Sequence, residues 1–197
     1  MLENGEEVST GIFKTPVQQR IRMRALNLDG DRQADLTVHG GQDKAVYAYP
    51  TEHYAYWKKE LPGMELPWGS FGENLSTQGL LEGDVCLGDR FTIGAAEVTV
   101  TQPRIPCFKL NLKFQCEDMV KRFLASRRTG FYFRVLREGE IGAGDEIVRV
   151  HQDENRVSVS DALKVYLGAP GSEELRARAL RVEYLSAAWR AELSEQV

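Results

Sequence analysis

Between residues 10 and 150 the sequence consists of short segments in which apolar and polar residues alternate, and glycines separate many of these segments. Alternation at period two is typical of strands that bury one face, and regularly spaced short strands are typical of a barrel or a sandwich. The predicted strands are residues 11–14, 21–26, 45–49, 90–93, 97–101, 131–136 and 146–150. The pattern therefore predicts a mainly β fold for this part of the chain.

Two helices are expected to interrupt these strands, which makes the predicted fold class α+β, mainly β with inserted helices. The first follows Thr51, a residue type that caps helix N-termini, and its apolar positions 54, 57 and 61 share one face. The second covers about residues 117–126, where apolar residues again form a stripe. Glycines at positions 139, 142 and 144 lie between two predicted strands, so we interpret them as a hairpin turn.

The character of the sequence changes near residue 151. Residues 151–156 are polar, and three short helical patterns follow, beginning near Ser158, Ser172 and Ser186. We therefore divide the chain into a β domain, residues 1–150, and a three-helix domain, residues 151–197. Because three short helices bury too little apolar surface to be stable alone, we expect them to pack on the main domain or on a partner.

Charge and hydropathy exclude several classes of function. The formal net charge is −4, which disfavours non-specific binding to nucleic acids and anionic membranes. The sequence has no apolar run of about 18 residues, the length that a membrane-spanning helix needs. Residues 1–7 are acidic and lack the apolar stretch of a signal peptide. We expect a cytoplasmic protein that binds neither membranes nor, in a stable complex, nucleic acids.

The cysteines and histidines do not form a recognisable metal motif. Cys86, Cys107 and Cys116 are scattered and include no CxxC pair, so neither a disulfide framework nor an iron–sulfur cluster is expected in this chain. The three histidines lack the spacing of a zinc site. The sequence also lacks the glycine-rich phosphate-binding motif of P-loop proteins and the GxSxG motif of serine hydrolases.

The most unusual segment is residues 102–110, in which prolines at positions 103 and 106 precede Cys107. Proline fixes φ and removes a backbone donor, so this segment is expected to be stiff and to leave a strand. Arg104 and Lys109 surround the cysteine with positive charge, which favours the thiolate that attacks or binds metals. The alternative is that Cys107 is a small buried apolar residue. The residues alone leave both interpretations open.

A second candidate site is His39–Gly40–Gly41, which Lys44 follows closely. Paired glycines let a backbone approach a ligand, and successive N–H groups bind anions. Lys44 would add positive charge and His39 a hydrogen-bond donor. An ordinary turn is the alternative interpretation.

The third candidate is Gly72–Glu73–Asn74, which carries side chains able to recognise the donors and acceptors of a heterocycle. An ordinary turn is again the alternative, and for this segment it is the interpretation that the residues alone favour. The two preceding candidates and this one lie far apart in the sequence, so a common site would require the fold to bring them together.

Taken together, these segments resemble MOSC domains, named after the C-terminal domain of molybdenum cofactor sulfurase. The segments that carry the resemblance are residues 28–35, 39–45, 71–75 and 102–107, in the order found in that family. The chain is most similar to the bacterial 6-N-hydroxylaminopurine resistance proteins, which carry a small three-helix domain after the MOSC barrel. The resemblance spans nearly the whole chain and implies a MOSC-type β-barrel followed by a three-helix tail domain.

The resemblance also implies a function. A protein of this type is expected to bind a molybdenum cofactor of the molybdopterin kind and to reduce N-hydroxylated bases such as 6-N-hydroxylaminopurine to amines, a detoxification. Cys107 is implied as the catalytic residue and metal ligand, and a soft thiolate suits a metal held by dithiolene sulfurs. The residues implied in binding the rest of the cofactor are His39, Gly40, Gly41, Lys44, Gly72, Glu73, Asn74 and Arg104.

The partners follow from the same resemblance. The substrate is expected to be a small N-hydroxylated compound, and a separate reductase must supply electrons because the chain cannot hold an iron–sulfur cluster. Pyridoxal phosphate is not expected, and the sequence leaves a homodimer open. The alternative function is a non-catalytic carrier of molybdenum cofactor or sulfur that uses Cys107. A purine-binding or nucleic-acid-binding module without redox function fits the acidic charge poorly.

Overall fold

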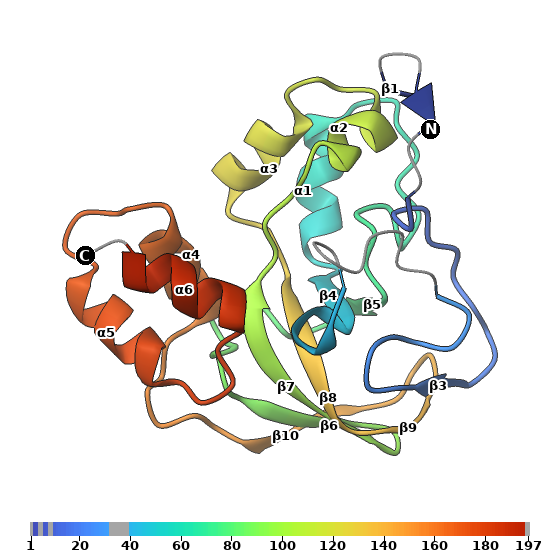
Figure 1. The fold of residues 1–197 in the computed structure, drawn as a ribbon. Coiled ribbons are helices and arrows are strands. Elements are labelled where there is room, and N and C mark those ends of the chain that lie inside the picture. Colours follow the sequence, from blue (N-terminus) through green and yellow to red (C-terminus); the bar gives the residue numbers. More distant parts are fainter. Residues whose placement is uncertain (1, 4–5, 8–9, 32–39, 196–197) are drawn as a thin grey trace.

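The centre of the molecule is a curled six-stranded sheet, a half-barrel (Figure 1). The computed structural model describes residues 2–3, 6–7, 10–31 and 40–195. The strand order is β10-β6-β7-β8-β4-β5, and only the pairing of β4 with β5 is parallel. The six strands are β4 (Val46–Pro50), β5 (Leu75–Thr77), β6 (Arg90–Ile93), β7 (Ala96–Pro103), β8 (Phe131–Arg137) and β10 (Ile147–His151). Two further pairs are β1 (Leu2–Glu3) with β2 (Glu6–Glu7) and β3 (Ile21–Met23) with β9 (Gly139–Ile141).

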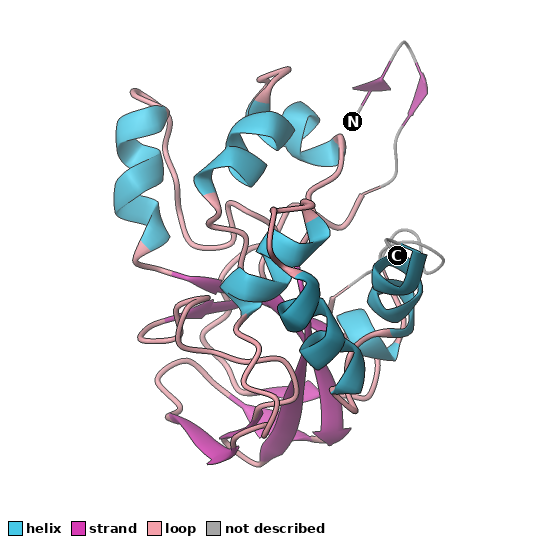
Figure 2. Cartoon of the chain, turned by 90° about the vertical axis from the view of Figure 1, so that its left-hand side faces the viewer, coloured by secondary structure: helices cyan, strands magenta, loops and turns pink. Residues whose placement is uncertain are grey.

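Helices cover this sheet in two groups (Figures 1 and 2). The first group is α1 (His53–Glu60), α2 (Lys109–Phe114) and α3 (Met119–Ser126), and the second is α4 (Val159–Tyr166), α5 (Glu173–Arg181) and α6 (Ala187–Glu195). A single 3₁₀ turn, η1 (Gln42–Lys44), precedes β4. The arrangement confirms the predicted α+β fold. None of the helices in the described part of the chain is long and apolar enough to cross a membrane.

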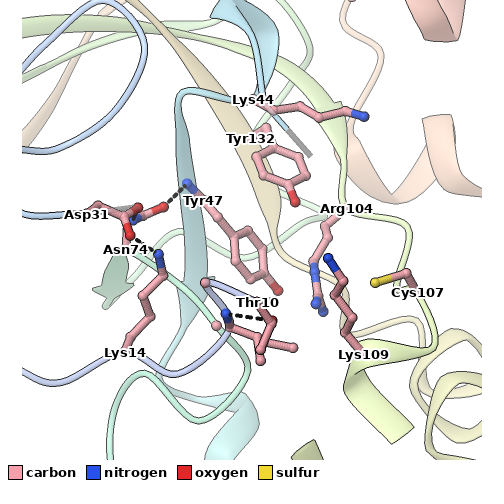
Figure 3. Close-up of a pocket in the computed structure, with 13 residues that line it drawn as sticks. Thr10, Lys14, Asp31, Lys44, Tyr47, Asn74, Arg104, Cys107, Lys109 and Tyr132 are labelled. Carbon is pink, nitrogen blue, oxygen red and sulfur yellow. Dashed lines mark hydrogen bonds and ion pairs between the residues drawn. The ribbon is translucent and has the colours of Figure 1, made fainter. Parts of the chain in front are cut away.

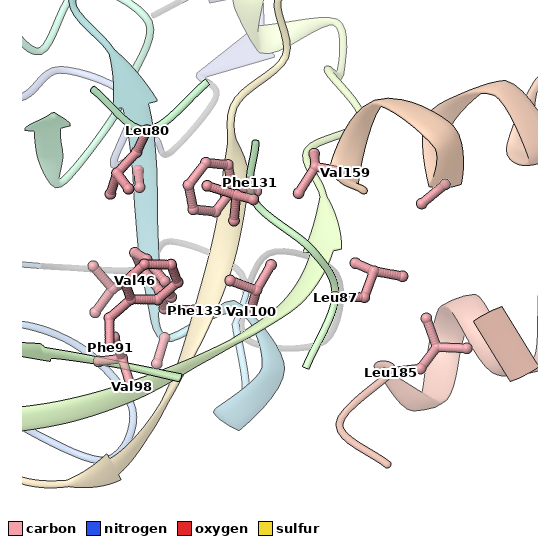
Figure 4. Packing of buried hydrophobic residues seen from close by; sticks show 14 of the residues in the cluster. Val46, Leu80, Leu87, Phe91, Val98, Val100, Phe131, Phe133, Val159 and Leu185 are labelled. Carbon is pink, nitrogen blue, oxygen red and sulfur yellow. The ribbon is translucent and has the colours of Figure 1, made fainter. Parts of the chain in front are cut away.

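Each helix group has its own apolar cluster against the sheet. The C-terminal group shares a cluster with the sheet, in which Val159 and Leu185 lie near Leu87, Val100 and Phe131 (Figure 4). The first group covers an aromatic cluster with its centre at Tyr49, Trp57, Phe71 and Phe123. The C-terminal helices therefore have no separate core.

Most of the predicted elements are present. The hairpin of β6 and β7, the strands β4, β8 and β10, and the helices α1, α3, α4, α5 and α6 all lie close to their predicted positions. Two of the predicted caps form: Ser158 Oγ accepts a hydrogen bond from the Asp161 N–H at 3.0 Å, and Ser186 Oγ accepts one from the Trp189 N–H at 3.2 Å.

Several local predictions are wrong, each for a physical reason. Residues 11–14 form no strand, because the backbone of Ile12 bonds to side chains: its carbonyl accepts from Lys113 Nζ and its N–H donates to Thr10 Oγ1. Glu52, not Thr51, is the N-cap of α1. The turn after β9 is not a hairpin, because β9 pairs with β3 whereas β10 pairs with β6. The short elements β5, β9 and α2 were not predicted, because three to six residues are too few to show a period.

Gly130 sits where three segments meet at the start of β8. It has φ of +64°, and a Cβ at this position would lie 2.3 Å from the Ala48 carbonyl oxygen. Its N–H donates to Glu82 Oε1 at 2.7 Å, and its carbonyl accepts from the Arg104 N–H at 3.2 Å. Only glycine fits, so Gly130 fixes the approach of β4 to β8.

The Gly130→Ala substitution is expected to lower the free energy of unfolding by at least about 3 kcal/mol, because it combines left-handed strain with a backbone clash. Gly171→Ala is the matched control: Gly171 has φ of +74°, is exposed, and has no atom within 4 Å of an added Cβ. This substitution should lower the free energy of unfolding only by the left-handed strain, about 1–2 kcal/mol. Urea unfolding curves measure both, and equal midpoints would contradict the role assigned to Gly130.

The shared core predicts that the sheet and the C-terminal helices unfold together. Trp189 is 3% exposed and stacks on Tyr166 with ring centroids 4.9 Å apart. Trp189→Ala should lower the free energy of unfolding by about 3–5 kcal/mol and still unfold in one transition. Circular dichroism and tryptophan fluorescence in urea test this, and two separate transitions in the wild-type protein would show independent domains.

Candidate functional site

A cavity lies between β4, β8, the segment that follows β7, and the described N-terminal segment (Figure 3). Its wall is unusually rich in charge and carries one thiol. The charged and thiol-bearing residues that line it are Lys14, Asp31, Lys44, Arg104, Cys107 and Lys109. Four of these six carry positive charge and one carries negative charge, so the cavity is suited to an anion.

Arg104 provides the central charge of this cavity. Its side chain is buried, with 6% of the residue exposed, and the guanidinium carbon lies 4.9 Å from the ring centroid of Tyr47 and 5.2 Å from that of Phe123. Tyr132 is its hydrogen-bonding partner. Among the described residues no carboxylate pairs with Arg104, and its Nη1 has no hydrogen-bond partner.

The Arg104 guanidinium stays protonated in this environment. Burial lowers its pKa, but the hydroxyl groups of Tyr47 and Tyr132 and the thiol of Cys107 raise it by more, so the pKa ends above its usual value. A buried positive charge without a carboxylate costs free energy unless a ligand compensates it. The unpartnered Nη1 therefore indicates an anionic ligand.

Cys107 lies three residues after Arg104, in the same segment between β7 and α2. The residue is half-buried and its sulfur is a free thiol. Its thiol points into the same space as the Arg104 guanidinium and the Lys109 ammonium group (Figure 3). The Cys107 carbonyl accepts the Leu110 N–H at 2.9 Å, which ties the cysteine to the start of α2.

Asn74 forms a rigid part of the wall. Its Oδ1 accepts the Tyr47 N–H at 2.9 Å, and its Nδ2 donates to Asp31 Oδ2 at 2.7 Å. Asp31 also pairs with the Lys14 ammonium group. Asn74 and Gly72 both line the cavity, and the bonds of Asn74 hold Asp31 and Lys14 in place.

Glu73 does not take part in the cavity, although we predicted it to bind the cofactor. It is 3% exposed, and its carboxylate accepts hydrogen bonds from the backbone N–H groups of Gly69 (2.8 Å) and Phe71 (3.0 Å). The hydroxyl groups of Tyr54 and Ser76 donate to the same carboxylate. Because these donors fill the carboxylate, Glu73 holds the loop before β5 together and does not face a ligand.

The glycine pair before η1 contributes less than predicted. His39 lies outside the described residues, and neither Gly40 nor Gly41 lines the cavity. Gly41 has φ of +88° and provides the turn into η1. Of the described residues of this loop, Lys44 alone lines the cavity, and burial lowers the pKa of its ammonium group.

Asp43 holds the same loop against the sheet and the last helix. Its carboxylate pairs with Arg134 of β8 and accepts the Ala187 N–H, at the start of α6, at 3.3 Å. Thr101 Oγ1 donates to the Asp43 carbonyl at 2.6 Å. The loop that carries Lys44 is therefore bound to two strands of the sheet and to the last helix.

Some of the residues that line the cavity could not be identified as site residues from the sequence. Tyr47 and Tyr132 occupy positions that read as ordinary strand residues, and Lys14 lies in a segment that we interpreted as a strand. Asp31 belongs to residues 28–35, which we used only for the family resemblance. Their shared position becomes visible only when β4 and β8 pair through Tyr47 and Tyr132.

Comparison with known proteins gives a consistent result. A MOSC domain model matches residues 35–148. The chain is 41% identical over 188 residues to YflK of Bacillus subtilis (strain 168), a match that covers 95% of this chain and 85% of YflK. The crystal structure of YiiM from Geobacillus stearothermophilus superposes with a TM-score of 0.83 at 36% identity and covers 94% of this chain and 88% of YiiM.

A fungal relative is longer. The chain is 34% identical over 164 residues to a protein named reductase from Gibberella moniliformis (strain M3125 / FGSC 7600). The match covers 82% of this chain but only 29% of the fungal protein. Most of that protein therefore lies outside the matched region.

Arg104→Met tests the assignment of the cavity to an anion. Because no carboxylate that the structure describes compensates the guanidinium, the variant is expected to keep a free energy of unfolding within about 1 kcal/mol of the wild type, or above it. Inorganic phosphate should raise the melting temperature of the wild type and not of the variant. Calorimetry with and without phosphate measures both effects, and a strongly destabilised variant that still responds to phosphate would refute the assignment.

Proposed function

The chain belongs to the MOSC domain family, and from this premise we propose that it binds a molybdenum cofactor of the molybdopterin type in this cavity and reduces N-hydroxylated bases such as 6-N-hydroxylaminopurine to amines. One observation carries the proposal: the buried guanidinium of Arg104 pairs with no carboxylate of the described residues and shares a cavity with the thiol of Cys107. A site with one buried positive charge and one soft donor suits a ligand that has an anionic group and a metal.

The residues of the cavity fit that group. A pterin phosphate is anionic, and Arg104, Lys44 and Lys109 offer it positive charge. No set of three histidine, cysteine or acidic side chains among the described residues could hold a metal ion by itself. Cys107 would then be the single protein ligand of a metal that its cofactor already holds through sulfur, which a thiolate suits.

The protein contributes binding and orientation, whereas the cofactor, when bound, supplies a two-electron reduction that removes the oxygen of the N–OH group. Arg104 would hold the anionic part, and Tyr132 would fix the orientation of the guanidinium. Asn74 and Asp31 would keep the wall rigid. Overall, an N-hydroxylated base, two electrons and two protons give the amine and water.

The electrons are proposed to come from a separate reductase. The fungal relative, which is named a reductase, extends well beyond the matched region, and this supports a second unit that delivers electrons. Cys86 is buried and belongs to another part of the fold from the cavity, so the described cysteines offer no cluster of their own. The three free cysteines also support a reducing compartment, the cytoplasm.

Cys107→Ala tests the proposed role of the thiol. Protein from a host that makes molybdenum cofactor should contain near-stoichiometric molybdenum and pterin in the wild type and little molybdenum in the variant. Elemental analysis and pterin fluorescence after oxidation measure the content. Reduction of 6-N-hydroxylaminopurine with a supplied electron donor should fall by at least about 100-fold in the variant.

Cys116→Ala is the matched control, because Cys116 is a half-buried free thiol that does not line the cavity. It should retain metal and activity. Equal metal content in wild type and Cys107→Ala would move the metal ligand away from Cys107. Cyanide-releasable sulfur on Cys107 without turnover would favour the alternative, a carrier of sulfur or cofactor.

A further inference from the structure

The segment Thr10–Lys14 forms one wall of the cavity, although it belongs to no helix or strand. Residues 10, 11, 12 and 14 line the cavity, whereas Phe13 points outward with 59% of its surface exposed. We call residues 10–14 the strap. A wall without a backbone ladder can move separately from the sheet, provided that few contacts hold it.

Lys113 of α2 makes the most specific of these contacts. Its Nζ donates to the Ile12 carbonyl at 2.8 Å and to the Gly69 carbonyl at 2.9 Å. The ammonium group also lies 5.4 Å from the ring centroid of Phe13. One half-buried side chain therefore joins the strap to the loop before β5.

The strap fits closely against that loop. A Cβ on Gly72 would lie 2.8 Å from Ile12 Cγ1, and a Cβ on Gly69 would lie 3.1 Å from Lys14 Cβ. At its far end, Lys14 pairs with Asp31. The strap is thus closed by one half-buried lysine, one ion pair and one isoleucine that packs against the aromatic cluster.

We propose that the strap lifts as a unit to admit a ligand to the cavity, and that Lys113 is the positioning residue that holds it closed. The proposal rests on the proposed function only in treating the cavity as a binding site. Lifting the strap exposes Arg104 and Cys107 without disturbing a β ladder, so the sheet stays intact.

The charge of Lys113 makes this closure depend on pH. Burial lowers the pKa of its ammonium group to about 8; Arg104 and Lys14 act in the same direction, and Glu73 opposes them. When the strap is lifted, the ammonium group of Lys113 is exposed to water, and its pKa returns toward 10.5. The lifted state therefore binds more protons, so rising pH favours closure between these two values.

Cleavage by a protease that cuts after lysine measures the lifted state, because the bond after Lys14 fits a protease only when the strap is free. Fragments are identified by mass, in protein without any added ligand. Lys113→Met should raise the rate of cleavage after Lys14 by about tenfold, because it removes the two hydrogen bonds that Lys113 Nζ donates, bonds that the amine and the ammonium group can both form. Lys121→Met, at an exposed lysine of α3, is the matched control and should leave the rate unchanged.

The pH dependence of closure is measured with the same cleavage assay. Relative to Lys113→Met, which lacks the titrating group, wild-type cleavage after Lys14 should be about tenfold slower at pH 9 than at pH 7. If Lys113→Met fails to fold, hydrogen exchange on the wild-type protein tests the proposal without the variant. The amides of the strap should exchange much faster than those of β7 and β8.

Two results would overturn the proposal. One is cleavage after Lys14 at the same rate in the wild type and in a folded Lys113→Met protein. The other is strap exchange as slow as that of the sheet, which would show that the strap opens only on global unfolding. Neither result depends on molybdenum or on the substrate, so the proposed function can hold when the strap proposal fails.

Discussion

The antiparallel pairing of β7 with β8 is the constraint on which the rest of the molecule depends. Its first half, at Val98 and Val100, lies in the core that the C-terminal helices cover. Its second half pairs Gln102 with Tyr132 and then Pro103 with Phe131, after a register shift. The chain leaves the sheet at that point, so one continuous ladder connects the apolar core to Arg104 and Cys107.

The buried charge at the cavity and the buried charge in the loop before β5 differ in how they are compensated. In the loop before β5, Glu73 is fully compensated by donors, and its burial therefore stabilises the fold. Arg104 is also buried, and no carboxylate in the described part of the chain pairs with it. Natural folds tolerate such a charge where binding requires it. Both charges are buried, and they differ in whether they have partners. That difference, and not the residue type, distinguishes a residue that stabilises the fold from one that binds a ligand.

The sequence allowed most of the fold to be predicted, because period-two strands and capped helices are local patterns. The residues alone marked Cys107, Lys44, Gly72, Asn74 and Arg104 as candidates with alternatives, and the family resemblance assigned them to one site; the fold brings all five to one cavity. What could not be predicted is non-local. Glu73 looks like a binding residue until its four donors are seen, and Tyr132 looks like a core residue until Arg104 lies beside it.

The last helix is more than a cover for the sheet. Asp43, two strands and the first turn of α6 share one set of hydrogen bonds, and Lys44 is the next residue along the chain. Displacing the start of α6 would therefore alter the position of a positive charge in the cavity. The contact is made by the backbone N–H of Ala187, so it depends on where the last helix lies and not on the side chains that the helix carries.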